Sequence, residues 1–150
     1  MDELDELYQE IILDHNKRPR GRGELPGATH TAQGDNPLCG DEIRVFVRLE
    51  GDKIADVKFI GEGCAISKAS ASLMTQAVRG KTVAQATEQI QKIHDMFTGQ
   101  GCCEHTSFDT DGEIAALGGV KKFPQRVKCA TLAWHALDAA LDGKPNVSTE

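Results

Sequence analysis

The stretch EIRVFVRLEGDKIADVKFI, residues 42–60, decides the fold of this chain. Over residues 43–49 apolar side chains alternate with charged ones, and residues 54–60 repeat the β-like composition after a turn at residues 50–53. A period of two places successive side chains on opposite faces of a strand. The pattern therefore predicts an antiparallel hairpin with one buried face. Phe46 interrupts the polar face, so part of that face is expected to be covered.

Helical periodicity surrounds this hairpin. Before it, residues 4–12 repeat apolar side chains at helical spacing and predict an amphipathic helix that ends near the Pro19-Arg20-Gly21 break. After it, the Ala- and Ser-rich residues 64–78 suit a helix packed closely on a sheet, and residues 82–97 predict a helix capped by the threonine at its start. A last helix is predicted at residues 124–143, which begin with proline and end in glycine.

The order of these elements predicts a single α+β domain over residues 1–150, with a small antiparallel sheet packed against helices in two layers. A short strand is expected at residues 28–32. Residues 98–119 lose periodicity and are interpreted as an inserted loop. The tail at residues 146–150 is expected to fray.

Composition narrows the classes of function. A formal net charge of −6 argues against nucleic acid as the main partner. No apolar run approaches the roughly 20 residues that span a bilayer, and the acidic N-terminus is unlike a signal peptide. The sequence thus predicts a cytoplasmic protein with no membrane partner. Basic clusters within residues 17–22 and 121–128 either dock an acidic partner or keep the surface solvated.

Five cysteines, an odd number, indicate metal or sulfur chemistry in a reducing cytosol. Cys39 precedes the hairpin, Cys64 begins a helix, and Cys129 lies in the first turns of the last helix. Asp41 adds a fourth donor two residues after Cys39. Three thiolates and a carboxylate would satisfy tetrahedral zinc, and three thiolates also suit iron–sulfur chemistry. No CxxC pair exists, so ordinary buried cysteines with a surface aspartate are an alternative interpretation.

Cys102, Cys103 and His105 lie in the predicted insert. They could bind a second metal or relay sulfur. Adjacent side chains rarely chelate one ion well, so an incidental exposed pair of cysteines is the favoured interpretation. Trp134, on the apolar face of the last helix, is expected to lie in the core.

The local sequence around the three cysteines is more informative than their spacing. NPLCGD at residues 36–41, GEGCAISKASAS at residues 61–72 and RVKCATLAW at residues 126–134 resemble, in this order, the motifs of the IscU/SufU family. The resemblance covers nearly the whole chain and implies an α+β fold with a role in making iron–sulfur clusters. Carried over by position, it implies four metal or cluster ligands: Cys39, Asp41, Cys64 and Cys129.

Within this family the chain resembles the SufU branch. An insert precedes the last helix, and Lys128 stands where the housekeeping scaffolds have a histidine, although a protonated lysine cannot ligate a metal. FPQRVK at residues 123–128 replaces the scaffolds' Leu-Pro-Pro-Val-Lys chaperone signal. SufU-type proteins are implied to bind zinc and to take persulfide sulfur from a SufS-type cysteine desulfurase, with downstream cluster-assembly proteins as further partners.

The resemblance also implies individual roles. Cys39 would be the sulfur acceptor, because its turn should be more mobile than the helix-bound Cys64 and Cys129. Arg126 is a candidate for a different reason: it lies near Cys129 in the sequence and could steer the anionic sulfur or dock the partner, or be a plain surface residue. Two other functions are open: a scaffold that assembles and transfers a [2Fe–2S] cluster, and a structural zinc domain with no sulfur traffic.

Overall fold

A sheet of four strands forms the base of the computed structural model, which describes residues 3–19, 21–36, 40–98, 124–143 and 146–148. Its strand order is β3-β2-β1-β4. The strands are β1 (His30–Asn36), β2 (Asp41–Glu50), β3 (Lys53–Glu62) and β4 (Asn146–Ser148). Because β2 pairs antiparallel with β1 and β3 while β4 pairs parallel with β1, the sheet is antiparallel except at one edge.

β2 and β3 form the hairpin that the alternating sequence predicts. Val45 pairs with Phe59 in the centre of the ladder. Ile43, Val45 and Val47 are fully buried, whereas Phe46, on the other face, is half-buried. Burial of this face fixes the register, since a slip of one residue would turn the buried row toward solvent.

Two parts of the sheet differ from the sequence prediction. The strand expected at residues 28–32 lies at His30–Asn36, where a glycine and a buried asparagine obscure the strand pattern. The tail expected to fray at residues 146–150 contains β4, so the expectation is wrong for Asn146–Ser148. β4 finds its partners on the edge of β1, a long-range pairing that a three-residue segment cannot signal.

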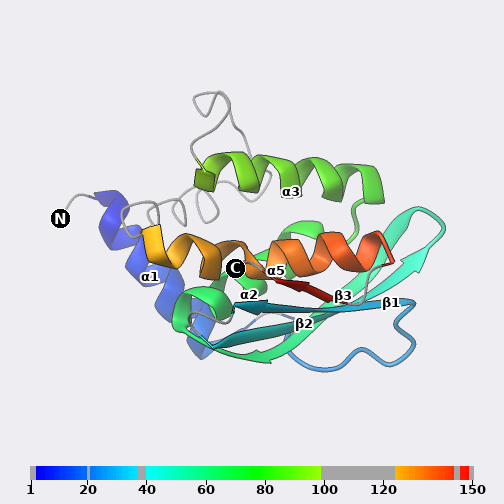
Figure 1. Ribbon diagram of the computed structural model, residues 1–150, viewed down its shortest axis with the longest axis horizontal. Helices are drawn as coiled ribbons and strands as arrows, with labels where there is room; N and C mark the ends of the chain where they lie inside the picture. The colour runs from blue at the N-terminus through cyan, green and yellow to red at the C-terminus, as the bar shows by residue number, and fades with distance from the viewer. Residues whose placement is uncertain (1–2, 20, 37–39, 99–123, 144–145, 149–150) are drawn as a thin grey trace.

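Helices cover one face of the sheet (Figure 1). They are α1 (Glu3–Lys17), α2 (Ala65–Val78), α3 (Val83–Thr98) and α5 (Pro124–Leu141). α2 and α5 lie on the sheet and against each other, α1 packs on α2, and α3 packs on α5. The predicted α+β class is confirmed, as are the four predicted helices. None of the described helices combines the length and apolarity that crossing a membrane requires.

Two hydrogen bonds at the start of α3 explain why the helix begins at this point. Thr82 Oγ1 accepts a hydrogen bond from the N–H of Gln85 at 3.1 Å, and Gln85 Oε1 accepts one from the N–H of Thr82 at 3.1 Å. This reciprocal pair satisfies two amides that a helix start leaves unpaired. The predicted cap at Thr82 is therefore confirmed.

A polar contact in the core joins α2 to α5. Ser70 Oγ donates to the carbonyl oxygen of Ala130 and accepts from the indole Nε1–H of Trp134 at 2.9 Å. Trp134 is only 1% exposed, which confirms its predicted core position. Because the bond reaches the residue next to Cys129, it helps to fix where the first turns of α5 lie.

A glycine in β1 lets α5 approach the sheet closely. A Cβ added at Gly34 would lie 3.0 Å from Leu132 Cδ1 and 3.2 Å from Ala136 Cβ. Both separations are tighter than ordinary van der Waals contact, so a larger side chain would press against α5. The close approach also brings the next inward-facing residue of β1, Asn36, to the N-terminal half of α5.

The stability of the fold is expected to depend on pH through His135 on α5. Its ring centroid lies 5.8 Å from that of His94 on α3, with the two rings edge to face. Burial, and then the charge of His94, lower the pKa of His135 below its ordinary value of 6.5, while Asp138 opposes the shift. Below that value the unfolded chain binds a proton that the folded chain resists, so stability is lost as pH falls toward the folded-state pKa.

Urea unfolding of wild type and His135→Gln at about pH 7.5 and about pH 5.5 checks this dependence. We expect the free energy of unfolding to fall less on acidification in the variant than in wild type. An equal fall in both proteins would show that His135 does not contribute.

Candidate metal site

Three donors from separate elements come together at one end of the sheet. Asp41 begins β2, Cys64 precedes α2, and Cys129 lies in the second turn of α5. One ligand atom of each lies within 4.8 Å of the others. Three of the four ligands implied by the sequence therefore converge, whereas Cys39 lies outside the described residues.

The other predicted site residues are not placed by the structure. Cys102, Cys103 and His105 lie outside the described residues, as do residues 99–119 of the predicted insert. Arg126 lies on α5, but its side chain is not among those described. What the sequence predicts for these residues therefore stays a prediction.

Asp41 is the organising residue of the site. It is only 1% exposed, and its Oδ1 accepts a hydrogen bond from the N–H of Cys64 at 2.9 Å. Its Oδ2 lies 3.8 Å from Cys64 Sγ. A Cβ added at Gly63 would lie 2.5 Å from Asp41 Oδ1, so only glycine lets the chain pass the carboxylate this closely.

Cys64 caps the N-terminus of α2. Its Sγ accepts a hydrogen bond from the backbone N–H of Ser67 at 3.4 Å, in the manner of an N-cap side chain. Asn16, near the end of α1, donates through Nδ2 to the carbonyl oxygens of Ala65 at 2.9 Å and of Ile12 at 2.7 Å. α1 thus supports the turn that carries Cys64, a residue that is half-buried.

Cys129 is fully buried and contacts a second buried side chain, Asn36 at the end of β1. Asn36 Nδ2 donates toward Cys129 Sγ at 3.5 Å. Asn36 Oδ1 and Ser67 Oγ have no hydrogen-bond partner among the described residues. Leaving such an atom buried and unpaired costs about 1–3 kcal/mol. Apart from its position in NPLCGD, nothing in the sequence singles out Asn36, because its contact with Cys129 depends on how closely α5 approaches β1.

The donor set fits a metal ion. Two sulfurs bound to one tetrahedral zinc at 2.3 Å stand about 3.8 Å apart, which the upper limit of 4.8 Å accommodates. Two thiolates and one carboxylate oxygen leave a fourth position, for which Cys39 is the candidate that the sequence supplies. The same set would also accept iron, since thiolates hold iron–sulfur clusters.

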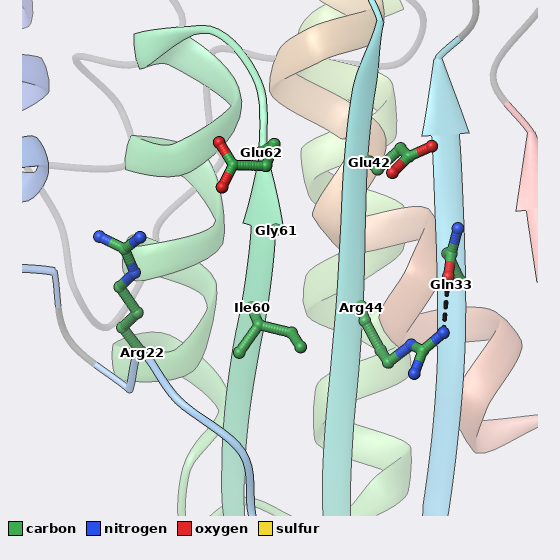
Figure 2. A pocket seen from close by; sticks show the side chains of 7 residues that line it. All are labelled: Arg22, Gln33, Glu42, Arg44, Ile60, Gly61 and Glu62. Atoms are coloured by element: carbon green, nitrogen blue, oxygen red, sulfur yellow. Dashed lines mark hydrogen bonds between the residues drawn. The ribbon is translucent and has the colours of Figure 1, made fainter.

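A separate, charged hollow of about 450 Å³ lies on the face of the sheet turned away from the helices (Figure 2). Glu42 and Glu62 stand directly opposite each other across β2 and β3, and Asp35 stands opposite Glu42 on β1. Arg44 Nη2 donates to the neutral Gln33 Oε1 at 2.9 Å. Neither Glu42 nor Glu62 forms an ion pair with another residue that the structure describes. Asp35 Oδ1 accepts a hydrogen bond from the neutral Gln33 Nε2 at 3.1 Å. Three acidic side chains therefore lie in a row across the sheet, with no positive partner among the described residues for Glu42 and Glu62.

Glu42→Gln is expected to stabilise the fold, because it removes the central charge of this row. Like charges directly opposite on neighbouring strands destabilise a sheet, so the free energy of unfolding should rise by about 0.2–1 kcal/mol at low salt. Glu50→Gln is the matched control on the same strand, since Glu50 faces Lys53 and should lose stability slightly. Urea unfolding of both variants at low and high salt tests this prediction. A lower free energy of unfolding in Glu42→Gln than in wild type would contradict it.

Comparison with known proteins agrees with the site. The NifU-like N-terminal domain family matches residues 7–130. The chain is 47% identical over 135 residues to a Bacillus subtilis protein named zinc-dependent sulfurtransferase SufU, a match that covers 90% of this chain and 89% of that one. It is 43% identical over 146 residues to the iron–sulfur cluster assembly scaffold protein IscU of Streptococcus pyogenes, with coverage of 97% and 89%.

Solved structures share the fold. The crystal structure of FiSufU from Fervidobacterium islandicum superposes with a TM-score of 0.80 at 38% identity, covering 91% of this chain and 97% of that one. A NifU-like N-terminal domain from Brucella abortus has a TM-score of 0.82 at 19% identity, which supports the fold alone. The fold and the donor cluster thus define a small domain of the NifU-like N-terminal class with a candidate metal site. Within that class the chain belongs to the IscU/SufU family, as its motifs predict.

Proposed function

We propose that this chain is a zinc-bound sulfur acceptor in iron–sulfur cluster assembly, which takes persulfide sulfur from a cysteine desulfurase. The observation that carries the proposal is the convergence of Asp41, Cys64 and Cys129 within 4.8 Å. A carboxylate oxygen is a less common ligand in a closed structural zinc site than a fourth thiolate, and it should exchange more readily. The mixed donor set therefore favours a site at which ligands exchange over a purely structural zinc site.

The residues of the site would have two roles, metal ligation and sulfur acceptance. Asp41, Cys64 and Cys129 would hold the ion with Cys39, and bound zinc would keep the thiols deprotonated. Cys39 is the proposed acceptor: its thiolate attacks the outer sulfur of the donor's persulfide. The sulfur–sulfur bond of the donor breaks, the donor cysteine leaves as a thiolate, and a persulfide forms on Cys39. No net oxidation takes place.

The proposed partner is a SufS-type desulfurase in the cytoplasm, with downstream cluster-assembly proteins as later recipients. Arg126, three residues before Cys129, would steer the anionic sulfur or dock the desulfurase. The basic residues within 17–22 and 121–128 offer further contacts for an acidic partner surface.

A scaffold that builds and transfers a [2Fe–2S] cluster is the second candidate. The 43% identity to a protein named as an IscU scaffold favours it, as does the ability of the thiolates to hold iron. Lys128 counts against it, because a lysine stands where the scaffolds have a histidine that could ligate the cluster. We therefore rank the sulfur acceptor first.

Metal content and desulfurase turnover, measured on the same samples, test the proposal. We expect one zinc per chain and stimulation of the desulfurase that is lost in Cys39→Ala and in Cys129→Ala. The double variant Cys102→Ala/Cys103→Ala, which removes the cysteines outside the motifs, is the control and should stimulate as wild type does. Unchanged turnover with both Cys39→Ala and Cys129→Ala would rule out the acceptor role. Iron with acid-labile sulfide, transferable to a recipient, would select the scaffold instead.

A further inference from the structure

Asn36 is buried beside the candidate metal site, although it belongs to no predicted donor set. It is the last residue of β1, pairs with Asp41 across the β1–β2 ladder, and exposes none of its surface. Its Nδ2 lies 3.5 Å from Cys129 Sγ, while its Oδ1 has no partner within the described parts of the chain. Native proteins rarely keep a buried polar atom unpaired without a use for the group that carries it. For Asn36, the geometry points to the hydrogen bond that its N–H donates to Cys129 Sγ.

This contact has a definite chemical effect. An amide N–H can only donate, and a cysteine that ligates a metal is a thiolate, which can only accept. A hydrogen bond to a ligating sulfur orients it and draws electron density from it. The sulfur becomes a poorer nucleophile. Cys64 also accepts a hydrogen bond, but from the backbone of Ser67. Of the two cysteines that the structure describes, Cys129 is therefore the one with a side-chain donor that substitution can remove.

We infer that Asn36 is a positioning residue that keeps Cys129 as the retained, weakly nucleophilic ligand and thereby directs incoming sulfur to another cysteine. The inference rests on the proposed function, in which Cys39 is the acceptor. The burial of Cys129 acts in the same direction, since a donor protein reaches a buried sulfur less readily than the partly exposed Cys64. Gly34 makes the contact possible, because it lets α5 lie close enough to β1 for Asn36 to meet Cys129.

Asn36→Leu tests the inference, because it removes the N–H and the unpaired oxygen at nearly constant volume. In the Co²⁺-loaded protein the thiolate-to-cobalt charge-transfer band should move to lower energy, since a sulfur without the hydrogen bond gives up electron density more readily. Zinc affinity, measured by competition with a chelator, should fall about 10- to 100-fold.

Ser67→Ala is the matched control. It also removes a buried oxygen near the same site that lacks a partner among the described residues, but the Ser67 hydroxyl donates to neither Cys64 nor Cys129. The cobalt spectrum and the zinc affinity of this variant should equal those of wild type. A shift as large as that of Asn36→Leu would mean that any change in packing moves the band, and would overturn the inference.

Mapping of persulfides by mass spectrometry after incubation with the desulfurase adds a second readout. Sulfur on Cys129 should be scarce in wild type and increase in Asn36→Leu. If Asn36→Leu folds and keeps the wild-type band energy and zinc affinity, the inference is wrong. If Asn36→Leu does not fold, Asn36→Asp, which keeps the size and loses the donor, decides by the same measurements. Failure of wild type to stimulate the desulfurase would overturn the proposed function, whereas the cobalt result would still stand by itself.

Discussion

Asp41→Ala should weaken zinc binding by about 100-fold or more. Loss of a mere hydrogen-bond partner of a metal ligand already lowers affinity about 10- to 100-fold, and Asp41 is both a candidate ligand and such a partner. Its Oδ1 accepts the N–H of Cys64 at 2.9 Å, so the substitution removes one donor and releases the turn that positions a second. Stimulation of the desulfurase should be lost together with the zinc.

Zinc content and chelator competition measure this effect. Asp41→Asn is the matched control, because its amide oxygen can still accept the N–H of Cys64 while the negative charge at the metal is gone. We expect its zinc affinity to lie between those of wild type and Asp41→Ala. Wild-type affinity in Asp41→Ala would remove the carboxylate from the ligand set and with it the argument for a mixed, exchangeable site.

Trp134→Ala should be the most destabilising single change in the core. The residue is 1% exposed, and its indole reaches from α5 to Ser70 on α2, so truncation leaves a large cavity in the core. Replacing a buried tryptophan by alanine lowers the free energy of unfolding by about 3–5 kcal/mol, a large part of the stability of a small domain. Chemical denaturation of the metal-loaded protein measures the loss.

Trp134→Phe separates the volume from the hydrogen bond. It keeps most of the ring but removes the Nε1–H that reaches Ser70, whose hydroxyl still donates to Ala130. A loss of about 1–2 kcal/mol is expected, since one buried bond and a little volume disappear. If Trp134→Phe destabilised the protein as much as Trp134→Ala, the hydrogen bond to Ser70 and not the packing of the ring would be the main contribution of Trp134 to stability.

The parts of the fold that local sequence could predict are those that local forces determine. Alternation over residues 43–49 predicts a strand with one buried face, and β2 buries alternate residues over this stretch. The threonine cap at Thr82 is likewise a property of a few adjacent residues. In both cases the pattern in sequence and the contact in space involve the same short segment.

Other parts depend on contacts between distant segments. β4 exists because the edge of β1 offers partners more than 100 residues away in the chain, and no pattern in three residues records this. The meeting of Asp41, Cys64 and Cys129 could be expected from motifs at element ends. The donor Asn36 could not, because its contact with Cys129 follows from the close packing that Gly34 allows.

β4 also has a protective effect on the molecule. It covers the backbone of Gln33–Asp35, which would otherwise be the free N–H and C=O groups of an edge strand. A bare edge is a template on which a second molecule can add its own strand, and this is a common start of aggregation. With Asn146–Ser148 in place, the outermost strand on this side of the sheet is only three residues long, and so short an edge is a poor template for a second molecule.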